Sequence, residues 1–307
     1  MFALGIAWGG RACQAAKPSA LKVKDNKIVN ASDKAVVLKG VSTHGIAWYP
    51  QYVNKQCFKS FKKMGANTIR LAFYSDDSAG YDKSLYIKVE EGVKAATDLG
   101  MYVIIDWHIL SDGNPKKNQK KAKEFFTYFA KKYAGQTNVL YEICNEPNGD
   151  VTWGRDIKPY AEKMIKLIRK YDKNGIIIVG TPTWSQDVDL VAEDPIRNQN
   201  NIAYAFHFYA ATHKDQLREK LKTANEKGLP VIVTEFSICD ASGNGKIDKK
   251  EAKAWMKLLK KHKIGRVAWN ISNKNETSAL IQPSCKKTDK ISKKNLSKSG
   301  KWIVGNW

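Results

Sequence analysis

The sequence is short of the features that mark several classes of protein. It has no apolar run of the ~18 residues that a helix needs to cross a membrane. No linker rich in proline, serine or threonine divides it, and its five cysteines (13, 57, 144, 239 and 285) include no Cys-x-x-Cys pair. An odd, widely spaced set of cysteines predicts neither a disulfide framework nor a thiolate zinc site. These absences exclude a helical membrane protein and a small disulfide-stapled domain.

Arginine is scarce, although the chain is strongly basic. Lysine and arginine together number 52 against 30 acidic residues, which gives a net charge of +22, but only seven of the 52 are arginine and they are scattered. Proteins that read nucleic acids concentrate arginine on one element. The lysines fall mostly on the polar faces of expected helices. We therefore interpret the charge as a solvated surface and expect neither a nucleic-acid nor a membrane partner.

The composition is that of a globular protein with a sizeable core. The chain has 307 residues, of which 43% are hydrophobic and 27% charged. Residues 1–19 are apolar and rich in small side chains, but lack the basic start of a good secretory signal. We interpret them as a partial leader or a remnant outside the fold. Residues 20–307 are expected to form one domain of a secreted, monomeric protein.

Short apolar runs alternate with longer amphipathic stretches along the chain. Each run is apolar on both faces, as is typical of a parallel strand covered by helices. Between the runs, apolar side chains recur at helical spacing, as Phe125, Phe126 and Phe129 do. The runs occupy residues 36–41, 68–72, 102–106, 139–143, 176–179, 202–206, 231–234 and 266–270.

Eight strands alternating with helices over about 280 residues predict an α/β fold of the (β/α)8 TIM-barrel type, whose typical size is about 250 residues. A doubly wound sheet is the alternative, but it needs a glycine-rich phosphate turn after the first strand. The segment Gly40-Val-Ser-Thr-His-Gly45 is not such a turn. Residues 21–35 alternate in polarity around turn residues such as Asp25-Asn26, which predicts a short β-hairpin at the barrel bottom.

Polar and aromatic side chains stand at the carboxyl ends of these runs, where a barrel of this type carries its chemistry. A purely structural barrel has little reason to gather histidines, carboxylates and tryptophans on one rim. The side chains in question are His44, Arg70, Asp106, Trp107, His108, Asn145, Glu146, His207, Tyr209, Glu235, Trp269 and Asn270.

Two glutamates directly follow buried runs, Glu146 after the fourth and Glu235 after the seventh, so both can face one cleft. Paired carboxylates serve glycoside hydrolysis, in which one protonates the leaving oxygen and the other attacks the anomeric carbon. Either glutamate alone could be a helix-cap neighbour or an ion-pair partner. Tryptophans in the expected loops favour a sugar ligand because indole faces stack on pyranose rings, although each could also pack under a loop. They are Trp48, Trp107, Trp153, Trp184 and Trp269.

These motifs together resemble glycoside hydrolase family five, and most closely the bacterial endo-β-1,4-glucanases of the Bacillus type. The resemblance covers about residues 21 to 303, and the motifs follow one another in family order at barrel spacing. The matching segments are His44-Gly-Ile-Ala-Trp48-Tyr, Thr68-Ile-Arg70, Asp106-Trp-His108, Leu140-Tyr-Glu-Ile-Cys-Asn-Glu-Pro147, His207-Phe-Tyr209, Pro230-Val-Ile-Val-Thr-Glu235-Phe and Trp269-Asn-Ile-Ser-Asn-Lys274-Asn-Glu276.

The resemblance implies a role for each matching residue. Glu146 would be the general acid/base and Glu235 the nucleophile, with Arg70 keeping Glu235 ionised. Asn145 would bond the sugar 2-hydroxyl. His207 and Tyr209 would tune the two carboxylates, and His44 and His108 would line the central subsites. Trp269 would form the floor under the sugar whose bond is cut, Trp48 would stack a more distal sugar, and Trp184 would stack a sugar on the aglycone side. Lys274 and Glu276 would bond the hydroxyls of the distal sugar.

The implied reaction is the endo-acting hydrolysis of β-1,4-glucan by double displacement, with no metal and no cofactor. Retention of anomeric configuration is expected, with carboxyl groups about 5 Å apart. The printed chain carries no carbohydrate-binding module, so soluble or amorphous glucan is the expected substrate. A mannanase or xylanase on the same scaffold is the first alternative. A non-catalytic glycan-binding barrel and a lysine-driven nucleic-acid binder are the others.

One further pattern resembles a calcium-binding loop. Residues 240–251 place Asp240, Asn244, Asp248 and Glu251 at spacings that fit most of an EF-hand. An EF-hand needs a helix on both sides, whereas a strand is expected just before this loop. We therefore interpret the segment as an ordinary loop of the barrel.

Overall fold

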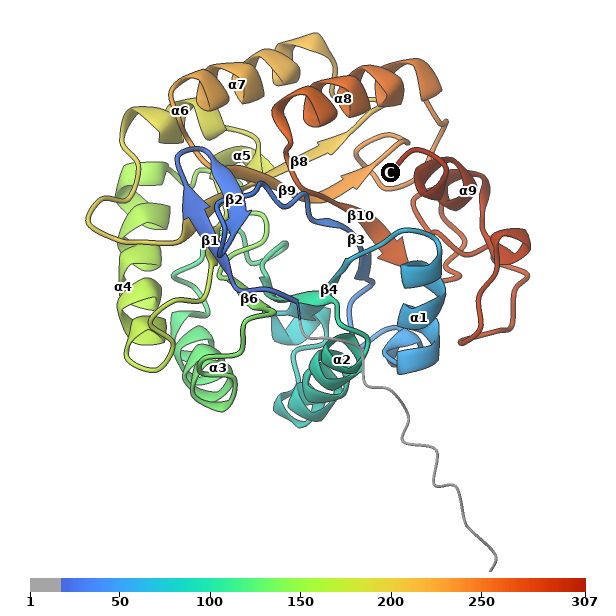
Figure 1. Cartoon of the computed structure of the whole chain (residues 1–307), viewed down its shortest axis with the longest axis horizontal. Helices are drawn as coiled ribbons and strands as arrows, with labels where there is room; N and C mark the ends of the chain where they lie inside the picture. The colour runs from blue at the N-terminus through green and yellow to red at the C-terminus, as the bar shows by residue number, and fades with distance from the viewer. Residues whose placement is uncertain (1–17) are drawn as a thin grey trace, which may run out of the picture.

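Eight parallel strands close into a barrel with helices around it in the computed structural model, which describes residues 18–307 (Figure 1). This confirms the predicted (β/α)8 barrel. The strands are hydrogen-bonded in the order β10-β3-β4-β5-β6-β7-β8-β9. Apart from residues 18 and 19, the expected leader lies outside the described residues. The barrel strands are β3 (Lys39–Thr43), β4 (Thr68–Tyr74), β5 (Tyr102–His108), β6 (Val139–Glu142), β7 (Ile177–Val179), β8 (Ile202–Tyr209), β9 (Val231–Ser237) and β10 (Arg266–Ile271).

Helices cover the outside of the barrel and short helical turns occupy several loops. Side-chain caps begin some of them: Asn54 accepts a hydrogen bond from the backbone of Cys57, and Asp248 one from Glu251. The helices are α1 (Lys55–Lys63), α2 (Tyr86–Asp98), α3 (Gln119–Lys132), α4 (Lys158–Arg169), α5 (Pro182–Ser185), α6 (Val188–Glu193), α7 (Asp215–Glu226), α8 (Lys249–His262) and α9 (Lys298–Val304). The turns are η1 (Pro50–Tyr52), η2 (Asp77–Ala79), η3 (Lys83–Leu85), η4 (Trp153–Ile157) and η5 (Lys293–Asn295).

Several strands run further toward the carboxyl end than the apolar runs predict. β5 ends at His108, β8 at Tyr209 and β9 at Ser237. Glu235 therefore lies within a strand, paired in register with His207, rather than after it. The polar side chains of the site are thus part of the rigid barrel, because hydrophobicity ends before strand pairing does.

A two-stranded hairpin, β1 (Leu21–Lys24) and β2 (Lys27–Asn30), closes the amino-terminal end of the barrel. Val23 and Ile28 pack against the apolar side chains that fill the barrel interior. The amide of Val23 also donates a 2.9 Å hydrogen bond to Asn201, just before β8. The predicted hairpin at the barrel bottom is confirmed.

Two apolar layers hold the fold together and leave the upper barrel free for polar groups. One layer fills the lower interior and includes Ile104, Leu140 and Ile232. The other lies between strands and helices and includes Phe125 and Trp255. Parallel strands covered on both faces need this double burial. Above the lower layer the interior turns polar, and that change positions the site.

Two further features of the described residues are the length of the helices and the burial of the cysteines. Among residues 18–307, no helix combines the length and the hydrophobicity needed to cross a membrane. Four cysteines are free and buried, namely Cys57, Cys144, Cys239 and Cys285. Cys13 lies outside the described residues. Burial raises the pKa of the Cys57 and Cys144 thiols, so these thiols are unreactive.

Candidate active site

A buried polar layer crosses the barrel at the carboxyl ends of its strands. Arg70 of β4, Asp106 of β5, Glu142 of β6, His207 of β8 and Thr234 of β9 are all at most 1% exposed. Their side chains meet inside the barrel directly above the apolar layer. Buried charges are costly unless they are paired, so the pairing among these groups decides what the site can do.

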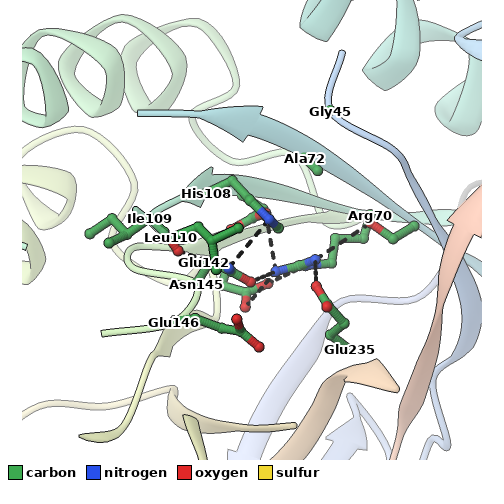
Figure 2. Close-up of polar contacts among 12 residues, drawn as sticks. Gly45, Arg70, Ala72, His108, Ile109, Leu110, Glu142, Asn145, Glu146 and Glu235 are labelled. Carbon is green, nitrogen blue, oxygen red and sulfur yellow. Dashed lines mark hydrogen bonds and ion pairs between the residues drawn. The ribbon is translucent and has the colours of Figure 1, made fainter. Parts of the chain in front are cut away.

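Arg70 is the centre of this layer (Figure 2). Its guanidinium holds Glu142 with two hydrogen bonds of 2.8 and 3.1 Å. It also contacts Asp106 and Glu235 at 3.1 Å each and donates to Asn145 at 2.5 Å. Burial opposes the charge, but these three carboxylates raise the pKa of Arg70, so it stays a cation. Arg70 does lie beside Glu235, although its bidentate partner is Glu142.

Glu142 is a functional candidate that the sequence reasoning did not single out, and Asp106 was placed on the rim without a role of its own. Burial would raise the pKa of Glu142, but Arg70 and His207 lower it to about 2. Burial raises the pKa of Asp106 well above its ordinary value, and the charge of Arg70 does not offset this. The available signal was a charged residue within each apolar run, at the alternate positions that point inward.

Glu146 and Glu235 face one another across the cleft that opens above this layer. One side-chain oxygen of each, together with a ring nitrogen of His207, lie within 4.8 Å of one another. Glu235 is held at both oxygens, because the Tyr209 hydroxyl donates to one at 2.6 Å and Arg70 to the other. Among residues 18–307, the Glu146 carboxylate has one side-chain hydrogen bond, of 2.8 Å to Nδ1 of His207. One carboxylate is therefore clamped and the other can exchange a proton.

His207 connects Glu146 to the buried layer with a defined tautomer. The Thr234 hydroxyl donates its proton to Glu142 at 2.8 Å, so it must accept from Nε2 of His207, also at 2.8 Å. Nε2 is therefore always protonated, and Nδ1 shares a further proton with Glu146. Burial would lower the pKa of His207, but the nearby Glu142 and Glu146 raise it to about 9. The His207–Glu146 pair thus keeps one exchangeable proton near neutral pH.

His108 takes the opposite state on the other side of Arg70. Its Nδ1 lies 2.7 Å from Asp106, and burial together with the charge of Arg70 lowers its pKa to about 3, so the ring is neutral. Asn145 donates to the carbonyl of Ile109 at 2.9 Å and faces Nε2 of His108 at 3.3 Å. Asn145 is fully buried. To bond a sugar hydroxyl it would have to release the 3.3 Å contact, so that role stays a prediction.

Most of the predicted site residues line one cavity of about 590 Å³. Arg70 and Asn145 lie beneath it rather than on its wall, and Trp48 lies outside it. The sequence reasoning missed other wall residues: Tyr74 at the end of β4, Thr183 in the short α5, and Gln186 and His213 on loops. The predicted residues on its wall are His44, His108, Glu146, Trp184, His207, Tyr209, Glu235, Trp269, Lys274 and Glu276.

Trp269 forms part of the cavity floor from the end of β10. Its ring stacks on His108, with centroids 5.1 Å apart and planes within 14°. The His44 ring also packs against Trp269, with the ring centroids 5.3 Å apart. Its Nδ1 accepts a 2.7 Å hydrogen bond from the backbone amide of Gly45. Burial and the nearby Lys274 lower the pKa of His44 to about 4. The neutral ring therefore offers its Nε2 proton to the cavity.

The two outer tryptophans are placed by loops. Trp184 is 44% exposed and lies in a turn where Thr183, Trp184 and Ser185 all have left-handed backbone angles. Three such residues in succession are rare for side chains with a Cβ. The turn is tied to the loop that follows β6, since Ser185 donates a 2.6 Å hydrogen bond to the carbonyl of Asn145. Trp48 is 56% exposed and donates to the carbonyl of Ala79 at 3.0 Å.

The EF-hand-like loop does not gather its acidic side chains. Asp240 bonds the backbone of Ser242 within its own turn at 3.0 Å. Asp248 caps α8, and Glu251 pairs with Arg218 at 2.8 Å. Among residues 18–307, the one cluster with metal-ligand spacing is Glu146, His207 and Glu235. None of the acidic side chains of the EF-hand-like loop belongs to this cluster.

A (β/α)8 barrel with two glutamates facing each other at the carboxyl ends of its strands has the architecture of a glycoside hydrolase. The family model "Cellulase (glycosyl hydrolase family 5)" matches residues 29–275. This chain belongs to that family.

Individual relatives agree with this assignment. Endoglucanase A of Butyrivibrio fibrisolvens is 42% identical over 293 residues, covering 92% of this chain and 67% of that protein. An endoglucanase of Clostridium saccharobutylicum is 44% identical over 287 residues, covering 92% and 64%. The catalytic domain of Thermobifida fusca endoglucanase Cel5A superposes with a TM-score of 0.88 at 37% identity, covering 93% and 96% of the two chains. The chain thus spans about two thirds of the length of these curated relatives.

Proposed function

We propose that this chain is a retaining endo-β-1,4-glucanase with Glu235 as nucleophile and Glu146 as general acid/base. The observation that carries this proposal is the closeness of Glu146 and Glu235. One carboxylate oxygen of Glu146 lies within 4.8 Å of one carboxylate oxygen of Glu235. Retaining enzymes hold their carboxyl groups about 5–5.5 Å apart, whereas inverting enzymes need about 6.5–9.5 Å to admit a water. The clamped glutamate is suited to attack and the proton-sharing one to acid/base work.

The reaction proceeds in two displacements. An oxygen of Glu235 attacks the anomeric carbon, the glycosidic bond breaks, and the leaving oxygen takes the proton of Glu146. A water then attacks the same carbon from the opposite face and loses its proton to Glu146, which releases Glu235. Two inversions give net retention.

The buried layer supports both glutamates. Arg70 and Tyr209 donate to different oxygens of Glu235, which fixes the orientation of this carboxylate for attack. His207 supplies a proton store next to Glu146 through their 2.8 Å contact. Because Nε2 of His207 is held by Thr234, the shared proton lies on the side that faces the cleft. Arg70, Tyr209 and His207 are thus positioning residues for the two carboxylates.

The cavity walls provide for a glucan chain that passes through. Trp269 would stack a sugar beneath the scissile bond, and His44 would donate to one of its hydroxyls. Lys274 and Glu276, 2.6 Å apart, present a paired donor and acceptor on the same side. Trp184 would stack a sugar on the aglycone side. We propose soluble or amorphous β-1,4-glucan as the substrate and a monomer as the active form. The enzyme would act outside the cell, because such a polymer does not enter cells.

Substitution of each glutamate tests the assignment. Glu146→Gln should lower kcat about 10²–10⁴-fold on glucan, but less on aryl cellobiosides whose leaving groups need no proton. Glu235→Gln should remove activity on both. Glu162→Gln is the matched control, because Glu162 is an exposed glutamate of α4. Equal loss on both substrates in the Glu146 variant would refute the acid/base assignment.

Product analysis tests the rest of the proposal. NMR of the earliest product should show the β-anomer, and initial formation of the α-anomer would refute retention. Reducing-sugar release should be greatest on carboxymethylcellulose in a panel with mannan and xylan. Greater release from mannan or xylan would assign the same machinery to another sugar.

A further inference from the structure

The carboxyl-terminal quarter of the chain carries an unusual concentration of lysine. Eight lysines lie between residues 246 and 263, on and around α8, and seven lie between residues 286 and 301, up to α9. All fifteen are exposed. The same two stretches contain only three acidic residues, Asp248, Glu251 and Asp289, and no arginine. We call these fifteen lysines the basic face.

Within residues 18–307, the ammonium groups of the basic face have no polar partners. In the part of the chain that the structure describes, none of the fifteen forms an ion pair or a hydrogen bond, whereas lysines elsewhere often do, as Lys55 and Lys94 both do with Asp98. Glu251 is already paired with Arg218, and Asp248 caps α8. Uncompensated like charges repel one another, so the basic face costs stability rather than adding to it.

The two lysine-bearing stretches meet next to the catalytic cleft. A groove of about 580 Å³ is lined by Lys246, three residues before α8, and by Lys298, the first residue of α9. Polar side chains such as Asn244 and Thr277 line it, and Glu276 borders both this groove and the catalytic cavity. Figure 1 shows α8 and α9 on the same side of the barrel. The basic face therefore begins at the edge of the cleft and extends over the outer helices.

The side chains of the face limit the kind of partner that it fits. Nucleic-acid surfaces combine basic residues with arginine forks and aromatic stacking platforms, and the basic face has no arginine. None of the exposed large hydrophobic side chains, such as Ile87, Tyr128 and Leu190, belongs to it, so it has nothing to insert into a bilayer. Lysine acts as a flexible point charge that suits single carboxylates along a hydrated chain. Amide and hydroxyl groups in the groove suit sugar hydroxyls.

We propose that the basic face binds an acidic polysaccharide, that is, a chain of uronic-acid sugars. This binding would hold the catalytic cleft close to glucan that is mixed with the acidic polysaccharide. The choice of a polysaccharide partner rests on the proposed function, since the groove adjoins the cleft. Binding itself needs no hydrolysis, so the two proposals can fail separately. Hydrolysis of cellopentaose, an uncharged substrate, reports on the proposed function alone.

The test compares binding of polygalacturonate by two variants that lose the same charge. The face variant carries Lys246→Gln, Lys250→Gln, Lys257→Gln, Lys293→Gln, Lys294→Gln and Lys298→Gln. The control variant carries Lys59→Gln, Lys120→Gln, Lys123→Gln, Lys163→Gln, Lys166→Gln and Lys170→Gln, all exposed lysines without an ion pair in residues 18–307. Calorimetry at low and moderate salt measures affinity, and circular dichroism checks folding.

The face variant should bind polygalacturonate at least about tenfold more weakly than the wild type and with a shallower salt dependence, while the control variant stays within about threefold. Equal losses in both variants would overturn the proposal, because net charge alone would then explain binding. No binding by the wild type at 0.1 M salt would also overturn it. So would tighter binding of duplex DNA than of polygalacturonate, which would assign the face to nucleic acid.

Discussion

The raised pKa of His207 makes the stability of this barrel depend on pH in a predictable way. His207 is buried, and its pKa rises from 6.5 in the unfolded chain to about 9 in the fold. A group whose pKa is raised by folding stabilises the fold fully below its unfolded pKa and loses that contribution as the pH rises through the folded value. Each pKa unit corresponds to about 1.36 kcal/mol, so His207 contributes about 3 kcal/mol at pH 6 and almost nothing at pH 10.

His207→Asn isolates this contribution. The free energy of unfolding, measured by urea titration from pH 6 to pH 10, should differ between wild type and variant by about 3 kcal/mol more at pH 6 than at pH 10. Loss of packing is the same at every pH and drops out of this comparison. His262→Asn is the control, because burial lowers the pKa of this partly exposed ring and gives it no alkaline contribution. A wild-type-to-variant difference that stays constant over this range would refute the assigned protonation.

The same proton should appear in catalysis. The His207–Glu146 pair loses its exchangeable proton near pH 9, so kcat/KM should fall with an alkaline limb there. Thr234→Val removes the acceptor of Nε2, destabilises the charged ring and should move that limb to lower pH. An alkaline limb that does not move in the valine variant would contradict the hydrogen-bonded chain from Glu142 to Glu146.

Three further predictions follow from contacts in the buried layer. Tyr209→Phe removes a hydrogen bond to the Glu235 carboxylate that is worth about 1.5–3 kcal/mol. We expect kcat/KM to fall about 10–100-fold, while the melting temperature changes by no more than a few degrees. Unchanged kinetics would refute the proposed role of this hydrogen bond. Glu142→Gln leaves Arg70 without its bidentate partner, and urea titration at pH 7 should show a loss of about 3–5 kcal/mol. Because folding lowers the pKa of His108 to about 3, its contribution is complete above pH 6.5 and is lost as the pH falls toward 3, so His108→Asn should flatten the acid limb of stability.

The barrel itself could be predicted from the sequence because its signal is local. Runs such as 102–106 and 231–234 are apolar on both faces, which parallel strands covered by helices require. Their ends could not be predicted, because strand pairing continues into polar residues: His207 pairs with Glu235, and Tyr209 with Ser237. Hydrogen-bonded pairing depends on the neighbouring strand, which the sequence pattern of one strand does not show.

The two facing glutamates were predictable, but most of their support was not. Glu146 and Glu235 adjoin apolar runs and match a family motif. Glu142 and Thr234 lie inside such runs, and their importance comes from distant partners: Glu142 meets Arg70, 72 positions away, and Thr234 meets Glu142, 92 positions away. The sequence assigned Trp48 and Trp184 to sugar platforms, and the structure places only Trp184 on the cavity wall.

Two histidines of the same layer illustrate why residue type alone does not give chemistry. His108 and His207 are both almost fully buried, and burial lowers the pKa of each. His207 has two glutamates close to its nitrogens, so its charge is favoured; His108 lies close to the Arg70 cation, so its charge is opposed. The guanidinium therefore acts in two ways, because it pairs with Glu235 on one side and keeps the His108 ring neutral on the other. Replacing Arg70 with lysine would keep the charge but not the fork that reaches Glu142, Glu235 and Asn145 together, so the layer requires arginine at this position.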